Sequence, residues 1–336
     1  MREALFWESL PGSAVRCHLC RLECTIPKGG RGRCRARENR DGRLMSLVYG
    51  QLIAAHVDPV EKKPLFHVLP GSRCYSVATL GCNFRCRHCQ NDSISQPKAE
   101  LIGRERPVPP EQVAQAAFAS GCAAIAFTYT EPTIFYEYAL DIARLSHESG
   151  LKNLFVTNGY MQKEALTRIA PLMDAANVDL KAFSEIFYRD IVGARLSEML
   201  DSLRCFRRLG IWLEITTLLI PGLNDSDQEL WDLAHFIVSD LGSDVPWHVT
   251  AFHPAYALRD RPPTPPETLL RARAIGRAEG LRHVYTGNIP GAGGENTVCP
   301  SCGKTVIERR GFSLQALHLT RGSCDFCGAA LAGIWA

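Results

Sequence analysis

Residues 81–91 read GCNFRCRHCQN and place Cys82, Cys86 and Cys89 at the spacing C-x3-C-x2-C. Three thiolates this close can hold three corners of a cubane [4Fe–4S] cluster, because soft sulfur ligands suit the iron of such clusters. The run supplies no fourth ligand, so one iron would keep an open coordination position, as catalytic metal sites do. A zinc knuckle or a chance grouping is the alternative interpretation.

The chain around this motif has the pattern of repeated βα units, since short apolar runs alternate with amphipathic stretches from Cys74 onward. Strands are expected at residues 74–80, 123–129, 151–157, 177–183, 211–220 and 247–252, with a last short strand at 283–286. Six such units are too few for a complete eight-stranded barrel. The predicted fold class is therefore α/β, a partial (β/α)6 barrel of the TIM type over residues 73–290, with its chemistry after the carboxyl ends of the strands.

Two of these strand ends carry polar candidates. Glu131 shares the parity of Phe127 and Tyr129 at the end of the second expected strand. Its carboxylate could bind an ammonium group there, or it could stabilise the start of the next helix. Asn158 and Gly159 end the third strand, where the backbone could approach a ribose closely or simply form a turn.

The fourth and sixth strands supply further candidates. Asn177, Asp179 and Lys181 alternate with apolar residues, which predicts three polar groups on one face of a buried strand. They could contact a ligand, or Asp179 and Lys181 could form a purely structural ion pair. His253 ends the sixth strand and could act as an acid, a base or a hydrogen-bond donor, or be a structural histidine.

A four-cysteine module is predicted at residues 1–72. Cys17, Cys20, Cys24 and Cys34 have the spacing C-x2-C-x3-C-x9-C, which suits either structural Zn²⁺, slightly favoured here, or a second, fully ligated iron–sulfur cluster. The arginines that follow are expected to offset the thiolate charge or to be solvated, rather than to bind nucleic acid; they are Arg31, Arg33, Arg35, Arg37, Arg40 and Arg43.

The rest of the first 72 residues, from Tyr49, is expected to be a connecting loop. Its mixed charges at Asp58, Glu61, Lys62 and Lys63 indicate a solvated segment. Because the loop leads directly into the first barrel strand, it could also cover the active site.

The C-terminal residues 291–336 form a second predicted module. Cys299, Cys302, Cys324 and Cys327 have the spacing C-x2-C-x21-C-x2-C, and a glycine follows each pair. Two such knuckles are typical of a zinc ribbon, with an auxiliary iron–sulfur cluster as the alternative.

Composition limits the class of protein. The 336 residues carry a net charge of only +3, which does not favour nucleic acid or an anionic membrane as a partner. No apolar run approaches the ~20 residues that span a bilayer. Eleven of the fourteen cysteines fall in the three clusters, which indicates metal ligation in a reducing compartment, so a cytoplasmic protein is expected.

The motifs together resemble one family. The cluster run is similar to the signature of the radical S-adenosylmethionine (SAM) enzymes. The four-cysteine N-terminus, TLGCNFRCRHCQN, FTYTEPTIFYEYA, DLKAF, LLIPGLNDS, FHPA, VYTGN and CPSCG resemble the radical SAM enzyme of the AmmeMemoRadiSam system, which is related to pyruvate formate-lyase activating enzymes. Departures include Tyr129 and Thr130, where glycines are common, and CHLCRLEC, where relatives often have Pro-His before the third cysteine.

The resemblance implies a [4Fe–4S] cluster whose open iron binds SAM. Electron transfer then cleaves SAM to a 5′-deoxyadenosyl radical that abstracts a substrate hydrogen. It further implies that the SAM-orienting residues are Glu131, Asn158, Asp179, Lys181, His253 and, beside adenine, His88. No catalytic residue beyond the cluster ligands is assigned.

The expected partners are a small-molecule or protein substrate and an external one-electron reductant such as flavodoxin or ferredoxin. One alternative is a glycyl-radical-enzyme activase acting on a protein backbone. In that case the barrel mouth must be open, whereas the two cysteine modules could instead close it over something smaller. A second alternative is a non-enzymatic metal- or RNA-binding scaffold.

Overall fold

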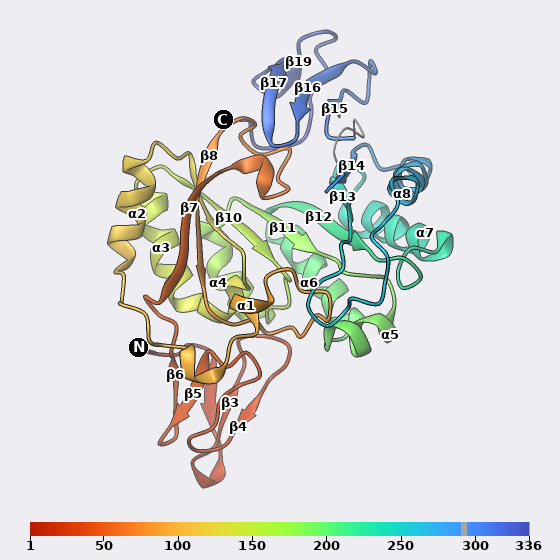
Figure 1. Ribbon diagram of the computed structural model, residues 1–336. Helices are drawn as coiled ribbons and strands as arrows, with labels where there is room; N and C mark the ends of the chain where they lie inside the picture. Colours follow the sequence, from red (N-terminus) through yellow and green to blue (C-terminus); the bar gives the residue numbers. More distant parts are fainter. Residues whose placement is uncertain (290–293, 336) are drawn as a thin grey trace.

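The computed structural model describes residues 1–289 and 294–335. Figure 1 shows a central sheet covered by helices on one side, with a small β-rich module at each end of the molecule. The two modules are the cysteine-rich segments at the two ends of the sequence. The predicted boundary between residues 290 and 291 lies outside the described residues.

The central sheet has eight strands in the order β14-β13-β12-β11-β10-β9-β8-β7. Seven of them, β8 to β14, are parallel, and β7 pairs antiparallel with β8 at one edge. The strands are β7 (Leu52–Pro59), β8 (Arg73–Thr79), β9 (Ala124–Phe127), β10 (Lys152–Thr157), β11 (Ala175–Asp179), β12 (Trp212–Leu219), β13 (Trp247–Ala251) and β14 (Val284–Gly287). The sheet ends at β7 and β14, so the barrel is partial, as predicted.

Helices cover the outer face of the sheet because their apolar stripes bury against it. In α3, for example, Tyr138, Ala139 and Ile142 are fully buried while Arg144 points to solvent. The α-helices are α1 (Asp92–Ser95), α2 (Pro110–Ala119), α3 (Tyr136–Glu148), α4 (Lys163–Ile169), α5 (Glu185–Phe187), α6 (Leu196–Arg208), α7 (Asp227–Phe236) and α8 (Pro266–Ala278). Short 3₁₀ or π turns are η1 (Pro11–Ser13), η2 (Val60–Lys62), η3 (Ala99–Leu101), η4 (Pro132–Phe135), η5 (Ala170–Leu172), η6 (Tyr188–Val192) and η7 (Ile237–Leu241). Within the described residues, no helix is long and apolar enough to cross a membrane.

The N-terminal module consists of two three-stranded sheets, β1-β6-β5 and β2-β3-β4. Its strands are β1 (Arg2–Glu3), β2 (Trp7–Ser9), β3 (Val15–Cys17), β4 (Thr25–Ile26), β5 (Arg37–Arg40) and β6 (Arg43–Ser46). One buried ion pair, between Arg37 of β5 and Glu137 of α3, attaches this module to the barrel.

The C-terminal module contains β15 (Thr297–Val298), β16 (Thr305–Arg310), β17 (Ser313–Leu317), β18 (Leu319–Thr320) and β19 (Ser323–Cys324). It packs on the segment that precedes β8: Arg309 donates to the carbonyl of Phe66 at 2.6 Å, and the ring Nδ1 of His67 lies 2.8 Å from the carbonyl of Ala332. This contact is at the amino ends of the barrel strands, opposite the N-terminal module (Figure 1).

The connecting segment 49–72 differs from its prediction as a solvated loop. Residues 52–59 form strand β7, and Asp58, Glu61 and Lys63 are nearly inaccessible to solvent. The part that follows β7 is mostly buried, and polar side chains of the barrel strands satisfy its backbone: Asn177 donates to the carbonyl of Pro64, and Glu214 accepts from the amides of residues 66 and 67. Burying a charge without a partner is costly, and the buried charges of Asp58, Glu61 and Lys63 each face an opposite charge.

Two strand boundaries also differ from the prediction. β9 ends at Phe127 because Tyr129 adopts a positive φ of 62°, so the strand parity assumed for Tyr129 and Glu131 is wrong. β11 spans residues 175–179 instead of 177–183, so Lys181 lies beyond the strand end. The side chain of Asn224 donates a hydrogen bond of 2.8 Å to the backbone carbonyl of Lys181.

Candidate active site

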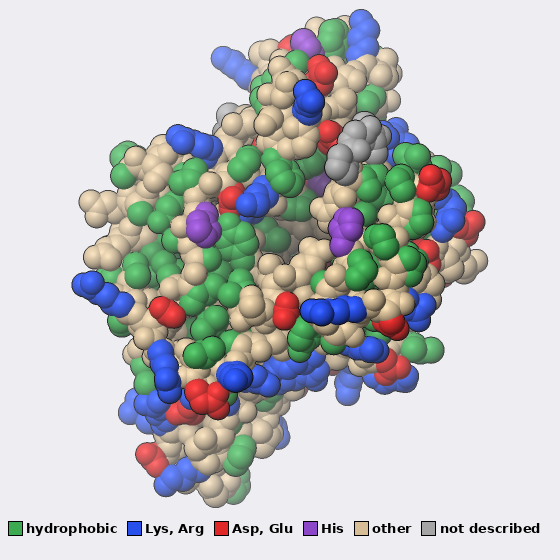
Figure 2. Space-filling view, in the orientation of Figure 1, with side chains coloured by type: hydrophobic (Ala, Val, Ile, Leu, Met, Phe, Trp, Pro, Cys, Tyr) green, Lys and Arg blue, Asp and Glu red, His purple; other side chains and the backbone are tan. Residues whose placement is uncertain are grey.

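A cavity of about 620 Å³ opens at the carboxyl ends of the parallel strands. Figure 2 shows the corresponding hollow near the centre of the molecule. Its walls combine the cysteine loop that follows β8 with residues at the ends of β9 to β14, and Lys62, Lys63 and Pro64 of the buried segment also line it. No residue of the first 36 and none of the described residues after 288 lines this cavity, so neither module closes it.

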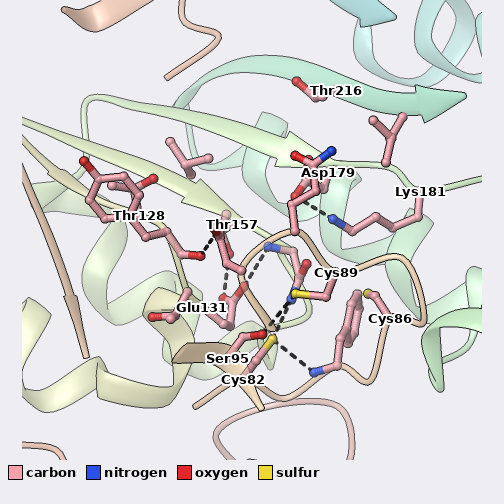
Figure 3. A pocket seen from close by; sticks show the side chains of 18 of the residues that line it. Cys82, Cys86, Cys89, Ser95, Thr128, Glu131, Thr157, Asp179, Lys181 and Thr216 are labelled. Atoms are coloured by element: carbon pink, nitrogen blue, oxygen red, sulfur yellow. Dashed lines mark hydrogen bonds and ion pairs between the residues drawn. The ribbon is translucent and has the colours of Figure 1, made fainter. Parts of the chain in front are cut away.

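The three cysteines of the cluster motif meet in this cavity (Figure 3). Their loop is fixed by hydrogen bonds from the amides of Arg85 and Arg87 to the carbonyls of Val192 and Ile191 in η6. Among the described residues that line the cavity, Cys82, Cys86 and Cys89 are the cysteines. The site therefore offers three thiols and an open side, as the spacing predicted.

Hydrogen-bond donors surround the sulfurs. The amide of Phe84 and the side-chain amide of Asn158 each lie 3.4 Å from Cys82 Sγ, and the hydroxyl of Ser95 lies 3.0 Å from Cys89 Sγ. Donors to sulfur tune an iron–sulfur cluster. Burial raises the pKa of Cys86 to about 12, so a bound metal is needed to hold it as thiolate. These features fit a three-thiolate cluster site.

Glu131 is a buried hub at the cavity wall. Its carboxylate accepts hydrogen bonds from the Thr133 amide at 3.0 Å, the Thr157 hydroxyl at 2.7 Å and the Asn158 amide at 2.7 Å (Figure 3). Burial raises its pKa. Glu131 thus caps η4, the alternative that the sequence left open, and in addition fixes the backbone that presents Asn158 to Cys82.

Asp179 and Lys181 form an ion pair of 2.6 Å beside the cysteines (Figure 3). Burial opposes the charge of Lys181, but Asp179 and the nearby Cys86 thiolate outweigh it and raise the pKa of the amine. The pair remains in contact although Lys181 has left the strand. A permanent cation beside Cys86 would offset the negative charge of a thiolate cluster.

The two predicted histidines differ in position. His88 is buried and lines the cavity, and its ring Nδ1 has no hydrogen-bond partner among the described residues. Burial, reinforced by Lys181, lowers its pKa to about 3, so the ring is neutral near pH 7. His253 is exposed and does not line the cavity. The structure therefore brings together five of the six predicted cofactor contacts and leaves His253 outside.

A set of paired polar side chains beside the cavity was not predicted from the sequence. Lys63 forms an ion pair of 2.7 Å with Asp58 and lies 4.4 Å from the centre of the Tyr129 ring, whose hydroxyl also donates to Asp58. Burial opposes the charge of Asp58, but its bonds to Lys62, Lys63 and Tyr129 outweigh this and lower its pKa. The expectation that this segment could also cover the active site agrees with the position of Lys62, Lys63 and Pro64 in the cavity lining. The contact with Tyr129 could not be predicted, because it depends on the long-range pairing of β7 with β8.

The comparisons with known proteins agree with this geometry. The radical SAM superfamily description matches residues 76–237, which include the three cysteines and most of the cavity wall. A Methanocaldococcus jannaschii protein described as Uncharacterized protein MJ0808 is 44% identical over 331 residues, covering 98% of both chains. The chain belongs to the radical SAM superfamily.

One more distant relative by sequence and one solved structure are also similar to this chain. The pyruvate formate-lyase-activating enzyme of Clostridium pasteurianum is 24% identical over 158 residues, which are 47% of this chain and 66% of that protein. The crystal structure of Streptococcus suis SuiB bound to S-adenosylmethionine aligns with a TM-score of 0.51 at 13% identity, over 69% of this chain and 53% of that one. This likeness shows the fold, a radical SAM partial barrel.

Two further cysteine groups flank this radical SAM barrel. In the C-terminal module, Cys299 and Cys327 have sulfurs 3.7 Å apart and Cys302 and Cys324 have sulfurs 3.8 Å apart; all four lie within 4.8 Å of one another. One tetrahedral Zn²⁺ with bonds of about 2.3 Å requires sulfurs about 3.8 Å apart. The group therefore fits a single ion.

The N-terminal cysteines Cys17, Cys20, Cys24 and Cys34 also converge, around a cavity of about 20 Å³. The arginines near them are mostly engaged within the protein: Arg31 and Arg40 with Glu38, Arg35 with the carbonyl of Pro97, Arg37 with Glu137 and Arg43 with Glu3. Lys and Arg side chains are numerous over this module in Figure 2.

Proposed function

We propose that this radical SAM protein is an enzyme that reductively cleaves SAM at a [4Fe–4S] cluster held by Cys82, Cys86 and Cys89. When bound, the cluster and SAM supply a 5′-deoxyadenosyl radical that abstracts a substrate hydrogen. The observation that carries the proposal is the arrangement of three thiols on one wall of a 620 Å³ cavity, with donors to sulfur and a cation beside them.

Each neighbouring residue has a role that its contacts support. Asn158 and Ser95 donate to the cluster sulfurs, and Glu131 holds the backbone of Asn158 in place. Lys181 offsets the thiolate charge, and Asp179 is available to bind an ammonium or hydroxyl group of SAM. His88 lines the cavity with a neutral ring, which suits contact with adenine. The exposed His253 is the weakest of the proposed contacts.

The buried segment closes the cavity floor. Lys63 and Tyr129 line the cavity there, and both bond to the buried Asp58 behind them. Exclusion of water protects a reactive radical. The substrate would enter from the open side, and either a small molecule or a protein segment is compatible with that side, since neither cysteine module covers it.

The motif resemblance supports assignment to the AmmeMemoRadiSam system, and the named activating-enzyme relative supports a glycyl-radical activase as the second candidate. An RNA-binding scaffold has less support, because the N-terminal arginines are paired. We propose Zn²⁺ for the C-terminal cysteines, a flavodoxin or ferredoxin as electron donor, and the cytoplasm as the location that keeps the thiols reduced.

The test is SAM cleavage by anaerobically reconstituted, reduced protein. We expect the native chain to release 5′-deoxyadenosine and methionine. Release by Cys86→Ala should be at least about 1,000-fold slower, because the cluster loses a ligand. Cys122→Ala is the matched control, since that buried cysteine lies outside the three groups, and it should retain activity. Undiminished release by Cys86→Ala, with circular dichroism showing a folded chain, would refute the site.

A second test addresses SAM binding. Asp179→Asn should raise the KM for SAM about tenfold, because one charge-assisted bond contributes about 1.5 kcal/mol or more. Asp190→Asn is the control, since Asp190 pairs with Arg189 on the surface of the neighbouring η6. Equal KM values in both variants would remove Asp179 from the site, and His253→Ala in the same assay would test the remaining histidine.

A further inference from the structure

The N-terminal cysteines lie in surroundings that suit a redox centre. Cys17, Cys20, Cys24 and Cys34 line their small cavity together with apolar side chains, among them Leu19, Ile26 and Ile134. The superfamily match begins at residue 76, so it does not include this group. A dry apolar shell with few donors is one of the means by which proteins set the potential of iron–sulfur clusters.

The spacing of the sulfurs distinguishes a single ion from a cubane. Ligands of one tetrahedral Zn²⁺ touch each other at about 3.8 Å and leave no room between them. The C-terminal four have this spacing. No three of the four N-terminal sulfurs lie within 4.8 Å of one another, and neither do those of Cys82, Cys86 and Cys89. The N-terminal cysteines also line a cavity of about 20 Å³.

A cubane places each thiolate on a different iron at a separate corner, so its ligands stand farther apart than those of one ion. We propose that Cys17, Cys20, Cys24 and Cys34 bind a second, fully ligated [4Fe–4S] cluster rather than Zn²⁺. This replaces the slight preference for zinc that the spacing in sequence suggested.

A buried cation accompanies the four thiols. Arg37 is 2% exposed, and its guanidinium lies 3.7 Å from Cys17 Sγ while it pairs with Glu137. A four-thiolate cluster becomes more negative when it accepts an electron, and a fixed positive charge beside one ligand favours that reduced state. The same arginine donates to the carbonyl of Leu5, so its position is determined by the module itself.

The second site is in direct contact with the catalytic loop. A Cβ at Gly81 would lie 2.8 Å from the carbonyl oxygen of Cys34, so the backbones of a ligand residue and of the residue before Cys82 touch. Asn83, which follows Cys82, lines the N-terminal cavity. Arg85 donates both to the carbonyl of Arg33 and to that of Cys82, the latter at 3.0 Å.

These contacts give the second cluster a role, which rests on the proposed function. A cluster held by Cys17, Cys20, Cys24 and Cys34 would supply a one-electron carrier between an external reductant and the site of Cys82, Cys86 and Cys89. A flavodoxin or ferredoxin would be oxidised by one electron, and that electron would reduce the SAM-binding site with no net change at the N-terminal site. The N-terminal module is therefore the electron entry of the enzyme.

Metal analysis tests the site independently of catalysis. The variant Cys82→Ala/Cys86→Ala/Cys89→Ala, reconstituted anaerobically with iron, sulfide and zinc, should retain about four irons, four sulfides and one zinc per chain, with a cluster EPR signal after reduction. The native chain should contain about eight irons. If the triple variant holds no iron and about two zincs, the proposal is overturned, whether or not the native protein cleaves SAM.

A second variant covers the case in which the triple variant does not fold. Cys20→Ser/Cys24→Ser should lower the iron of the native chain from about eight to about four and leave the zinc at about one. Iron unchanged at about four in both native and variant protein, with zinc falling from two to one, would assign Zn²⁺ to this module instead.

The relay is tested with two reductants. In Cys24→Ser, 5′-deoxyadenosine formation driven by reduced ferredoxin should fall at least tenfold, whereas formation driven by dithionite, a small reductant that can reach the cavity directly, should fall less than threefold. Cys302→Ser in the C-terminal module is the control and should leave the ratio of the two rates unchanged. An equal loss of activity with both reductants in Cys24→Ser would exclude the relay. The metal analysis of the native chain would still decide separately whether the cluster is present.

Discussion

The two four-cysteine modules of this protein have similar ligand sets and opposite placements. The N-terminal module touches the cysteine loop at the carboxyl ends of the strands, and the C-terminal module packs against the buried segment at their amino ends. Each contributes a buried arginine to its contact with the rest of the protein: Arg37 pairs with Glu137 in the first case, and Arg309 donates to the carbonyl of Phe66 in the second. The four sulfurs of the second module lie within 4.8 Å of one another, and no three sulfurs of the first module meet that limit.

Four cysteines by themselves do not specify the kind of site that they form. Where the module contacts the loop of Cys82, the cysteines line a small cavity together with Arg37, which supports the proposed redox cluster. Where the module contacts only the base of the barrel, the sulfurs are at the distance that one ion imposes, as structural zinc requires. The following experiments separate redox from structural roles in decreasing order of effect.

Removal of the C-terminal metal should have the largest effect. Structural zinc sites contribute about 10 kcal/mol or more to folding, so Cys302→Ser should leave residues 297–324 without stable structure. Hydrogen exchange measured by mass spectrometry should show loss of protection there and unchanged protection in β8 to β14. Iron content should stay the same. Protection retained after zinc loss would mean that this module folds on its packing alone.

Replacing each of the two buried arginines should lower the free energy of unfolding by a different amount. Arg37→Met leaves the buried Glu137 without its cation and should lower the free energy of unfolding by about 4 kcal/mol. Arg309→Met should cost about 2 kcal/mol, because its partners are mainly carbonyls and the Glu61 carboxylate is 3.7 Å away. Urea unfolding measures both. Arg37→Met/Glu137→Gln should recover most of the loss, and failure to do so would show that Arg37 acts on the cysteines instead.

Substitution of one glycine beside each module should have different effects on SAM cleavage. Gly81 has a φ of 108° and faces the carbonyl of Cys34, so Gly81→Ala should cost about 3 kcal/mol and slow SAM cleavage at least tenfold. Gly303 has a φ of 74° with open space around it, so Gly303→Ala should cost about 1 kcal/mol and leave cleavage unchanged. Equal effects on cleavage would indicate that the contact with Cys34 is not needed.

Part of the pH dependence of stability should come from His67 at the base of the barrel, in addition to the part from the buried His88. Burial lowers the pKa of His67 to about 4, while an unfolded histidine titrates near 6.5. Stability is therefore complete above pH 6.5 and falls as the pH drops toward 4, by about 2 kcal/mol between pH 7 and pH 5. The groups around this ring are Glu214, His248, His283, Tyr285 and Arg309.

The matched pair for this effect is His67→Asn and His18→Asn. Asparagine keeps a donor for the carbonyl of Ala332, so His67→Asn should flatten the slope measured by thermal unfolding at several pH values. His18 lies on the surface of the N-terminal module between Glu8 and Glu23, and its replacement should leave the slope unchanged. A slope that His67→Asn does not alter would assign the acid sensitivity to other groups.

Much of the site could be predicted because metal ligands close in sequence are close in space. The spacing of Cys82, Cys86 and Cys89 indicated one site, and the alternation of strands and helices placed Asn158, Asp179 and Lys181 at the same edge of the sheet. The parity argument failed at Glu131 because a positive φ at Tyr129 interrupts the strand. The identification of 49–72 as a loop failed because a charged segment is buried when each charge finds a partner across the fold.

Local spacing and period were sufficient to indicate the three cysteine groups, the βα order and the superfamily. The contacts at long range depend on the packing of the whole fold: β7 with β8, Lys63 and Asp58 with Tyr129, and Cys34 with Gly81. It also set the distances between sulfurs, because residues that share a motif adopt the spacing that the packing around them permits. The choice between one ion and a cluster depends on those distances.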